Sequence, residues 1–173
     1  MNITIRTPAL SMQADAYFIK NPLETKNAFT VTSAKDAADV LRLKGEGLIG
    51  DLKELIRGYD FTSISSNELA RIGLKLHEVE LLDEHAMSFF TSGNMAFDKN
   101  GHQTQKDVKF NAIAMFNQML GDNRALVREW PMYAQQESFR IVTKGLVGAN
   151  KAINALFYFA NSDGNDLSVS IRA

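Results

Sequence analysis

The chain has no cysteine, only three prolines and no excess of either charge. Without cysteine, a disulfide framework, a thiolate metal site and a cysteine nucleophile are all excluded. This agrees with a reducing compartment, and we expect a cytoplasmic protein. Because 19 basic residues face 20 acidic ones, the basic excess typical of nucleic-acid-binding domains is missing. We therefore expect no nucleic-acid partner.

Long hydrophobic runs are absent as well. The longest apolar stretch, residues 152–160, covers about half of a membrane span, and Asn154 interrupts it. Residues 1–8 lack the basic-then-apolar pattern of a signal peptide. We therefore expect no membrane partner.

What the chain does contain is typical of a single globular domain spanning residues 1–173. Hydrophobic residues make up 45% of it and charged residues 23%, close to the averages for folded proteins. A chain of this length buries enough surface to form a core without disulfides. Apolar residues recur at helical spacing over most of its length, so we predict a mainly α fold with a bundle-like core.

Capping residues predict where several helices begin. Ser33 is followed three residues later by Asp36, and Ser65 by Glu68, which is the pattern of a capping box. Asp83 is predicted to cap a further helix after a tight turn.

The second half of the chain carries similar signals. Thr104 with Asp107 predicts the start of a helix that Gly121 ends. A short helix then stops before Trp130-Pro131, because a residue that precedes proline resists the helical conformation. The last helix is predicted from about Gln135 to Ala160.

Three short segments alternate apolar and polar residues as half-buried strands do. They are residues 3–5, 29–32 and 167–171. We predict that some of them form a small antiparallel sheet, which would make the fold α+β; one such arrangement places the terminal segments side by side.

The segment Gly45-Glu-Gly-Leu-Ile-Gly50 matches the dinucleotide-binding pattern G-x-G-x-x-G. That chemistry requires a turn from a strand into a helix, so that backbone amides meet a pyrophosphate. The preceding residues 37–44 have the pattern of an amphipathic helix. A break or kink in a helix is therefore the favoured interpretation.

Three side chains have the spacing of a metal site. On one continuous helix, His77, Glu80 and Glu84 share a face and are suited to zinc, iron or manganese. The alternative is that the helix breaks before Asp83, in which case these carboxylates form a solvated acidic edge and a helix cap. We assign no cofactor, and the metal site stays open as a hypothesis.

Clustered aromatic residues indicate a second type of site. The pair Phe89-Phe90 and the run 157–159 are consecutive on predicted helices, so their rings cannot all face one core. Exposed aromatics are favoured at protein interfaces. We predict contact with a protein partner or a second copy of the chain, for example in a dimer, through Phe89, Phe90, Tyr158 and Phe159; the alternative is that they are core residues.

Catalytic motifs are missing from the sequence. It has no G-x-S-x-G elbow and no cysteine, and we assign no catalytic residue. The expected function is therefore a non-catalytic protein–protein interaction or accessory role. The alternative is a small-ligand- or metal-binding enzyme with a pocket between helices.

The segment from Asp60 to Leu69, followed by a leucine-bearing helix and by residues 82–87, resembles a segment of small uncharacterised bacterial helical proteins. In these proteins an I-S-x-x-E-L cap opens a helix that turns into a second helix with an acidic cap. The resemblance implies a bacterial source and no known chemistry.

Overall fold

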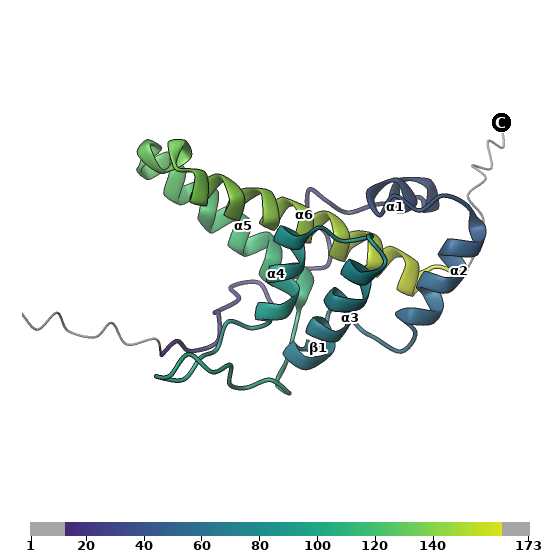
Figure 1. Ribbon diagram of the computed structural model, residues 1–173, viewed down its shortest axis with the longest axis horizontal. Helices are drawn as coiled ribbons and strands as arrows, with labels where there is room; N and C mark the ends of the chain where they lie inside the picture. The colour runs from purple at the N-terminus through teal and green to yellow at the C-terminus, as the bar shows by residue number, and fades with distance from the viewer. Residues whose placement is uncertain (1–12, 164–173) are drawn as a thin grey trace, which may run out of the picture.

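The computed structural model describes residues 13–163, which contain six α-helices and a pair of two-residue strands (Figure 1). The strands β1 and β2 pair antiparallel. The fold is therefore mainly α with a small antiparallel sheet, as the sequence predicts. In chain order the elements are α1 (Ala34–Val40), α2 (Glu46–Leu55), β1 (Ile64–Ser65), α3 (Ser66–Glu78), α4 (Glu84–Ser92), β2 (Lys109–Phe110), α5 (Ala112–Glu129), the 3-10 helix η1 (Pro131–Gln135) and α6 (Glu137–Asn161).

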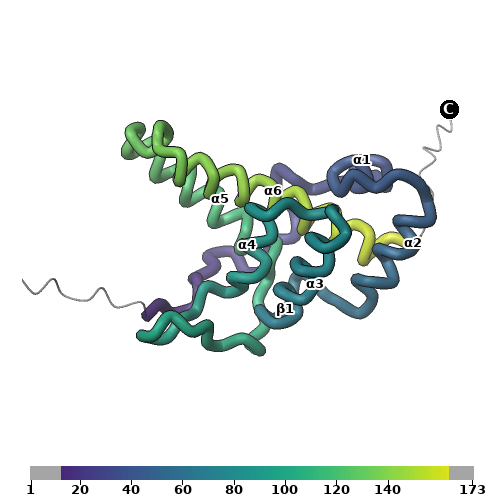
Figure 2. The backbone as a smooth tube through the Cα atoms, in the orientation of Figure 1, coloured from purple at the N-terminus to yellow at the C-terminus, as the bar shows by residue number. Residues whose placement is uncertain are grey.

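The longest helix, α6, crosses the molecule and forms the centre of the fold (Figure 2). Helices α1, α4 and α5 pack against it, and α3 packs on α4. The apolar residues of α6 recur every three or four positions, so one face of the helix stays continuously buried; Leu146, Ile153 and Leu156 belong to it. Across from them, the rings of Phe90 and Phe116 lie 5.4 Å apart in the core.

Among the described residues, the sheet joins two segments from the middle of the chain. Ile64 pairs with Phe110, and Ser65 pairs with Lys109. The strand predicted at residues 29–32 is wrong, because residues 28–29 form a turn and residues 30–32 contain no strand. The predicted segments 3–5 and 167–171 lie outside the described residues.

Local capping signals predict the first helices correctly. The Ser33, Ser65 and Asp83 side chains each accept a hydrogen bond from the backbone N–H three residues later. Gly45 has a φ of 106°, a conformation that favours glycine, and separates α1 from α2. The G-x-G-x-x-G pattern therefore marks a break between two helices, as we expected.

The predicted start and end of the next helix are wrong. Residues 104–108 contain no helix, because the following residues extend and pair with β1. Helix α5 begins after Asn111, whose side chain accepts a hydrogen bond from the Ala114 N–H. It then continues through Gly121 to Glu129. A glycine inside a helix costs only about 1 kcal/mol, which is too little to end a helix by itself.

An extended segment, the N-terminal strap (residues 17–24), is held against α5 by side chains of that helix and its cap. The Asn111 amide donates to the Glu24 carbonyl at 2.8 Å. The Gln118 amide donates to the Phe18 carbonyl at 2.7 Å. The strap therefore lies along α5 without any regular secondary structure of its own.

Candidate interaction site

At one end of the molecule, α5 and α6 extend past the other helices and are joined by η1 (Figure 1). We call residues 121–144 the projecting hairpin. Among them only Asn123 is buried, whereas most of α6 from residue 145 to residue 159 is buried. The hairpin therefore consists of two helices that cover one another but are covered by little else.

The sequence explains how the hairpin turns and stays together. Pro131 lacks the N–H that would continue α5, and η1 begins there. The ring of Tyr133 stacks on the ring of Phe139, with centroids 5.5 Å apart, which fixes η1 against α6. Nearer the body, the Thr143 hydroxyl donates to the side-chain carbonyl of Asn123 at 2.9 Å and links the two helices.

Large apolar side chains gather on the projecting hairpin. Five of the eleven that are exposed within residues 13–163 belong to it, with between 39% and 64% of their surface accessible. Tryptophan and methionine are among the residue types enriched at protein interfaces. The five are Leu126, Trp130, Met132, Ile141 and Val142.

A hollow of about 730 Å³ opens between the two helices of the hairpin. We call it the basic groove. Its apolar lining comes chiefly from Val127, Phe139 and Val147, and its lining residues include no carboxylate. Its four cationic side chains are Arg124, Arg128, Arg140 and Lys144.

A second hollow, of about 700 Å³, lies where α1 and the turn between α3 and α4 meet α6. It carries both signs of charge, for example Asp39 and Asp83 with Lys151. Lys144 and Val147 line both hollows, so the two hollows adjoin along α6.

Two of the three predicted metal residues, His77 and Glu80, line this second hollow, and the three do not share one helix. His77 is in the last turn of α3, and its Nδ1 lies 2.9 Å from the Leu82 carbonyl oxygen. Glu80 lies in the turn with a φ of 60°, and Glu84 is the first residue of α4. Within residues 13–163, no three or more His, Asp or Glu side chains are arranged to hold a metal ion. The metal site stays a hypothesis without supporting geometry.

The predicted aromatic residues divide into two groups. Phe90 and Phe159 are core residues with 0% and 2% of their surface exposed, so a partner does not reach them in this fold. Phe89 and Tyr158 are half-buried and pack against the core. Consecutive aromatics are largely enclosed because α4 packs against both α3 and α6, and α6 packs against α1, α4 and α5, which sequence spacing alone does not reveal.

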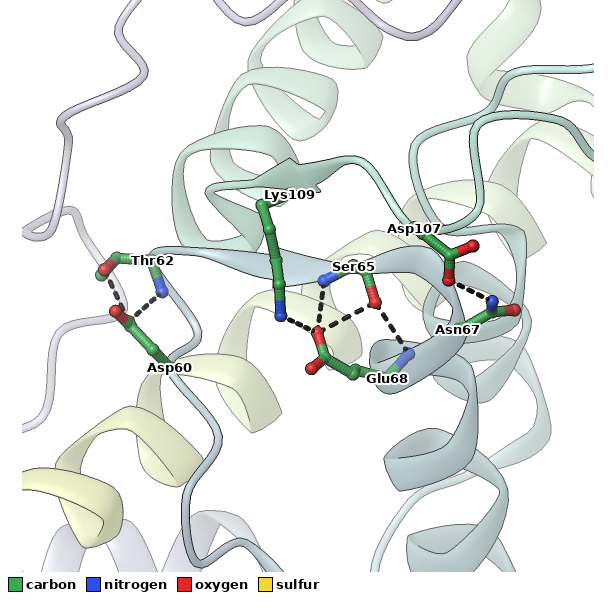
Figure 3. Close-up of polar contacts among 7 residues, drawn as sticks. All are labelled: Asp60, Thr62, Ser65, Asn67, Glu68, Asp107 and Lys109. Atoms are coloured by element: carbon green, nitrogen blue, oxygen red, sulfur yellow. Dashed lines mark hydrogen bonds and ion pairs between the residues drawn. The ribbon is translucent and has the colours of Figure 1, made fainter.

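A polar cluster near the sheet accounts for another group of charged residues (Figure 3). The Ser65 N–H donates to the Glu68 carboxylate at 2.8 Å, and the Lys109 ammonium forms an ion pair with the same oxygen. Chiefly the Lys109 hydrogen bond, and then the Ser65 N–H, lower the pKa of Glu68 from 4.5 to about 2. The Asn67 amide donates to Asp107 at 2.8 Å beside it. These contacts join α3 to β2 and give the cluster a structural role.

Comparison with known proteins gives no family for this chain. No protein-family model matches it, and neither does any curated protein or solved structure. The resemblance of residues 60–87 to small bacterial helical proteins therefore stays a prediction. Across residues 13–163, no helix is both long and apolar enough to cross a membrane.

The hairpin residues are the part of the candidate site that the sequence did not indicate. The only signal for them is the predicted helix break at Trp130-Pro131, with the apolar residues Leu126 and Met132 on either side of it. Helical periodicity identifies an apolar stripe but not whether another helix covers it.

Proposed function

We propose that this protein is a non-catalytic binding protein that contacts another protein through its projecting hairpin. The observation that supports this is the concentration of exposed apolar side chains on residues 126–142, next to an open groove. Exposed apolar side chains that gather on one part of a folded protein are a mark of an interaction site.

The build of the hairpin favours binding over a purely structural role. The Asn123–Thr143 hydrogen bond links α5 to α6 and the Tyr133–Phe139 stack links η1 to α6, so the hairpin has a fixed arrangement before a partner arrives. Such preorganisation reduces the conformational entropy that binding would otherwise cost. Trp130, with 51% of its surface exposed, is suited to anchoring a partner.

The alternative of a small-ligand- or metal-binding enzyme has less support. The second hollow does border His77 and Glu80. Within residues 13–163, however, these side chains do not join other ligands in a metal-binding arrangement.

Site-specific photocrosslinking in cells of the source organism tests the proposed function. We would place a photoreactive phenylalanine at Met132 and, as the matched control, at Leu48, which is 47% exposed on the body of the molecule. We expect a discrete crosslinked species from position 132 and none from position 48. Equal products from both positions, or none from position 132, would contradict the proposal.

A double substitution then tests whether the crosslink depends on the apolar surface. Leu126→Glu with Ile141→Glu places charges on two exposed hairpin positions and should abolish the crosslink at position 132. Because both side chains are exposed, the free energy of unfolding should change by no more than about 0.5 kcal/mol per site. A crosslink that persists at full yield would show that the apolar surface is not the contact.

A further inference from the structure

We infer that the partner presents an acidic amphipathic helix, which docks in the basic groove with its apolar face against the apolar lining of the groove. This inference rests on the proposed function and specifies the chemistry of the partner. It is carried by the shape of the groove, by its apolar lining and by the sign and placement of its charges.

The shape of the groove suits a helix. The groove lies between α5 and α6. Its apolar lining comes from Val127 on α5 and from Phe139 and Val147 on α6. Because the second hollow shares Lys144 and Val147, the two adjoining hollows together border α6 from Phe139 to Ala152. At 1.5 Å per residue this length is about 20 Å, which accommodates a helix of about 13 residues. An amphipathic helix in an apolar groove is a recurring mode of recognition.

The charges around the groove specify an acidic helix. Arg124 and Arg128 are four residues apart on α5, and Arg140 and Lys144 are four residues apart on α6. Like charges at this spacing destabilise a helix. The ion pairs found within residues 13–163 involve none of these four side chains. Carboxylates along the flanks of a docked helix would pair with both sets and relieve the repulsion.

The same charges disfavour the other occupants. A second copy of the chain that docked groove to groove would bring its own Arg128 and Arg140 against those of the first. An anionic membrane surface would neutralise the charge, but it is flat and would not enter a depression between two helices. An acidic helix satisfies both the charge and the concave shape.

Selection from a displayed peptide library tests the inference with the full chain as bait. The library consists of helical peptides of about 18 residues with leucines fixed along one face and the flanking positions randomised among Glu, Gln and Lys. We expect selection to enrich Glu at the flanks. The selected peptide should bind about tenfold more tightly than its Lys-flanked counterpart, as a few partly exposed ion pairs allow.

Charge reversal supplies the matched variants. Arg128→Glu with Arg140→Glu should invert the preference so that Lys-flanked peptides are enriched. Lys99→Glu with Lys106→Glu makes the same change in charge at exposed positions outside the groove and should leave the preference for Glu intact. Arg128→Gln with Arg140→Gln disturbs the hairpin less and should weaken the preference for Glu without inverting it.

Several results would overturn the inference. The natural sequence could enrich peptides with Gln or Lys at the flanks, or enrich none. The Lys99/Lys106 variant could lose the preference for Glu. A dimer in light scattering that disappears in the Arg128/Arg140 variant would assign the groove to a second copy. Binding to phosphatidylserine vesicles that disappears in the same variant would assign it to a membrane surface.

The photocrosslinking experiment separates this inference from the proposed function. A crosslink at Met132 together with no acidic preference in the library would leave the hairpin as a binding surface and remove the acidic helix. Failure of both experiments would remove the hairpin as a binding surface altogether.

Discussion

Alanine should destabilise this protein at Gly73 and stabilise it at Gly121. Both glycines lie inside helices, so the chemical change is the same. At Gly73 an added Cβ would come within 3.0 Å of the Phe90 Cβ on α4. At Gly121 an added Cβ would meet nothing within 4 Å. The two substitutions therefore share the gain in helix propensity and differ only in packing.

The expected magnitudes follow from these contacts. Replacing glycine by alanine inside a helix gains about 1 kcal/mol, which is the whole effect at Gly121. At Gly73, carbon atoms that pack at about 3.5–4.0 Å require α4 to move by at least about 0.5 Å. The Phe90 Cβ is attached directly to the backbone, so the whole helix must shift, at a cost of about 3 kcal/mol. The net loss at Gly73 is then about 2 kcal/mol.

Urea denaturation followed by circular dichroism measures both changes. With a slope of about 2 kcal/mol per molar urea, the unfolding midpoint should fall by about 1 M for Gly73→Ala and rise by about 0.5 M for Gly121→Ala. Equal midpoints for Gly73→Ala and the natural sequence would refute the close contact between α3 and α4. A destabilising Gly121→Ala would refute the open surroundings of that position.

Two further predictions concern ionisable groups. Because the folded-state pKa of Glu68 is lowered from 4.5 to about 2, its charge stabilises the fold above pH 4.5, and this contribution disappears as the pH falls toward 2. Glu68→Gln should therefore lower the free energy of unfolding at pH 7 by up to about 1 kcal/mol, a figure discounted for partial exposure. In urea titrations this difference from the natural sequence should shrink at lower pH. A difference that does not depend on pH would contradict the ion pair with Lys109. Burial, and then the hydrogen bond with Asp122, raise the pKa of Tyr17 to about 12, so folding favours the neutral phenol and this contribution is lost as the pH rises from 10 through 12. Asp122→Asn should lower the pKa of Tyr17 toward 10 in an ultraviolet titration, and an unchanged titration would show that Asp122 does not act on the phenol.

Local features of the sequence predict the beginnings of helices well. Ser65 and Asp83 cap helices because their partners lie only three residues further along the chain, so the interaction needs no other element. The break before Pro131 is equally local.

Features that depend on distant parts of the chain could not be predicted in this way. Lys109 and Phe110 are extended because they pair with β1, more than forty residues earlier, and this displaces the helix expected to begin at Thr104. Phe90 and Phe159 are enclosed because several helices surround them. The hairpin is exposed because none of α1 to α4 extends along it. Each outcome depends on which elements meet in space, and a single helical stripe carries no information about that.

The N-terminal strap has a consequence for the folding of the protein during its synthesis on the ribosome. Its hydrogen bonds to α5 and the preceding cap join residues between 87 and 105 positions apart. The strap is therefore synthesised long before the surface that receives it. At a synthesis rate of about 5–20 residues per second, roughly 5–20 s pass between the synthesis of the strap and that of the α5 residues that bind it. A part of the fold that is made early is thus secured only after α5 is in place to receive it.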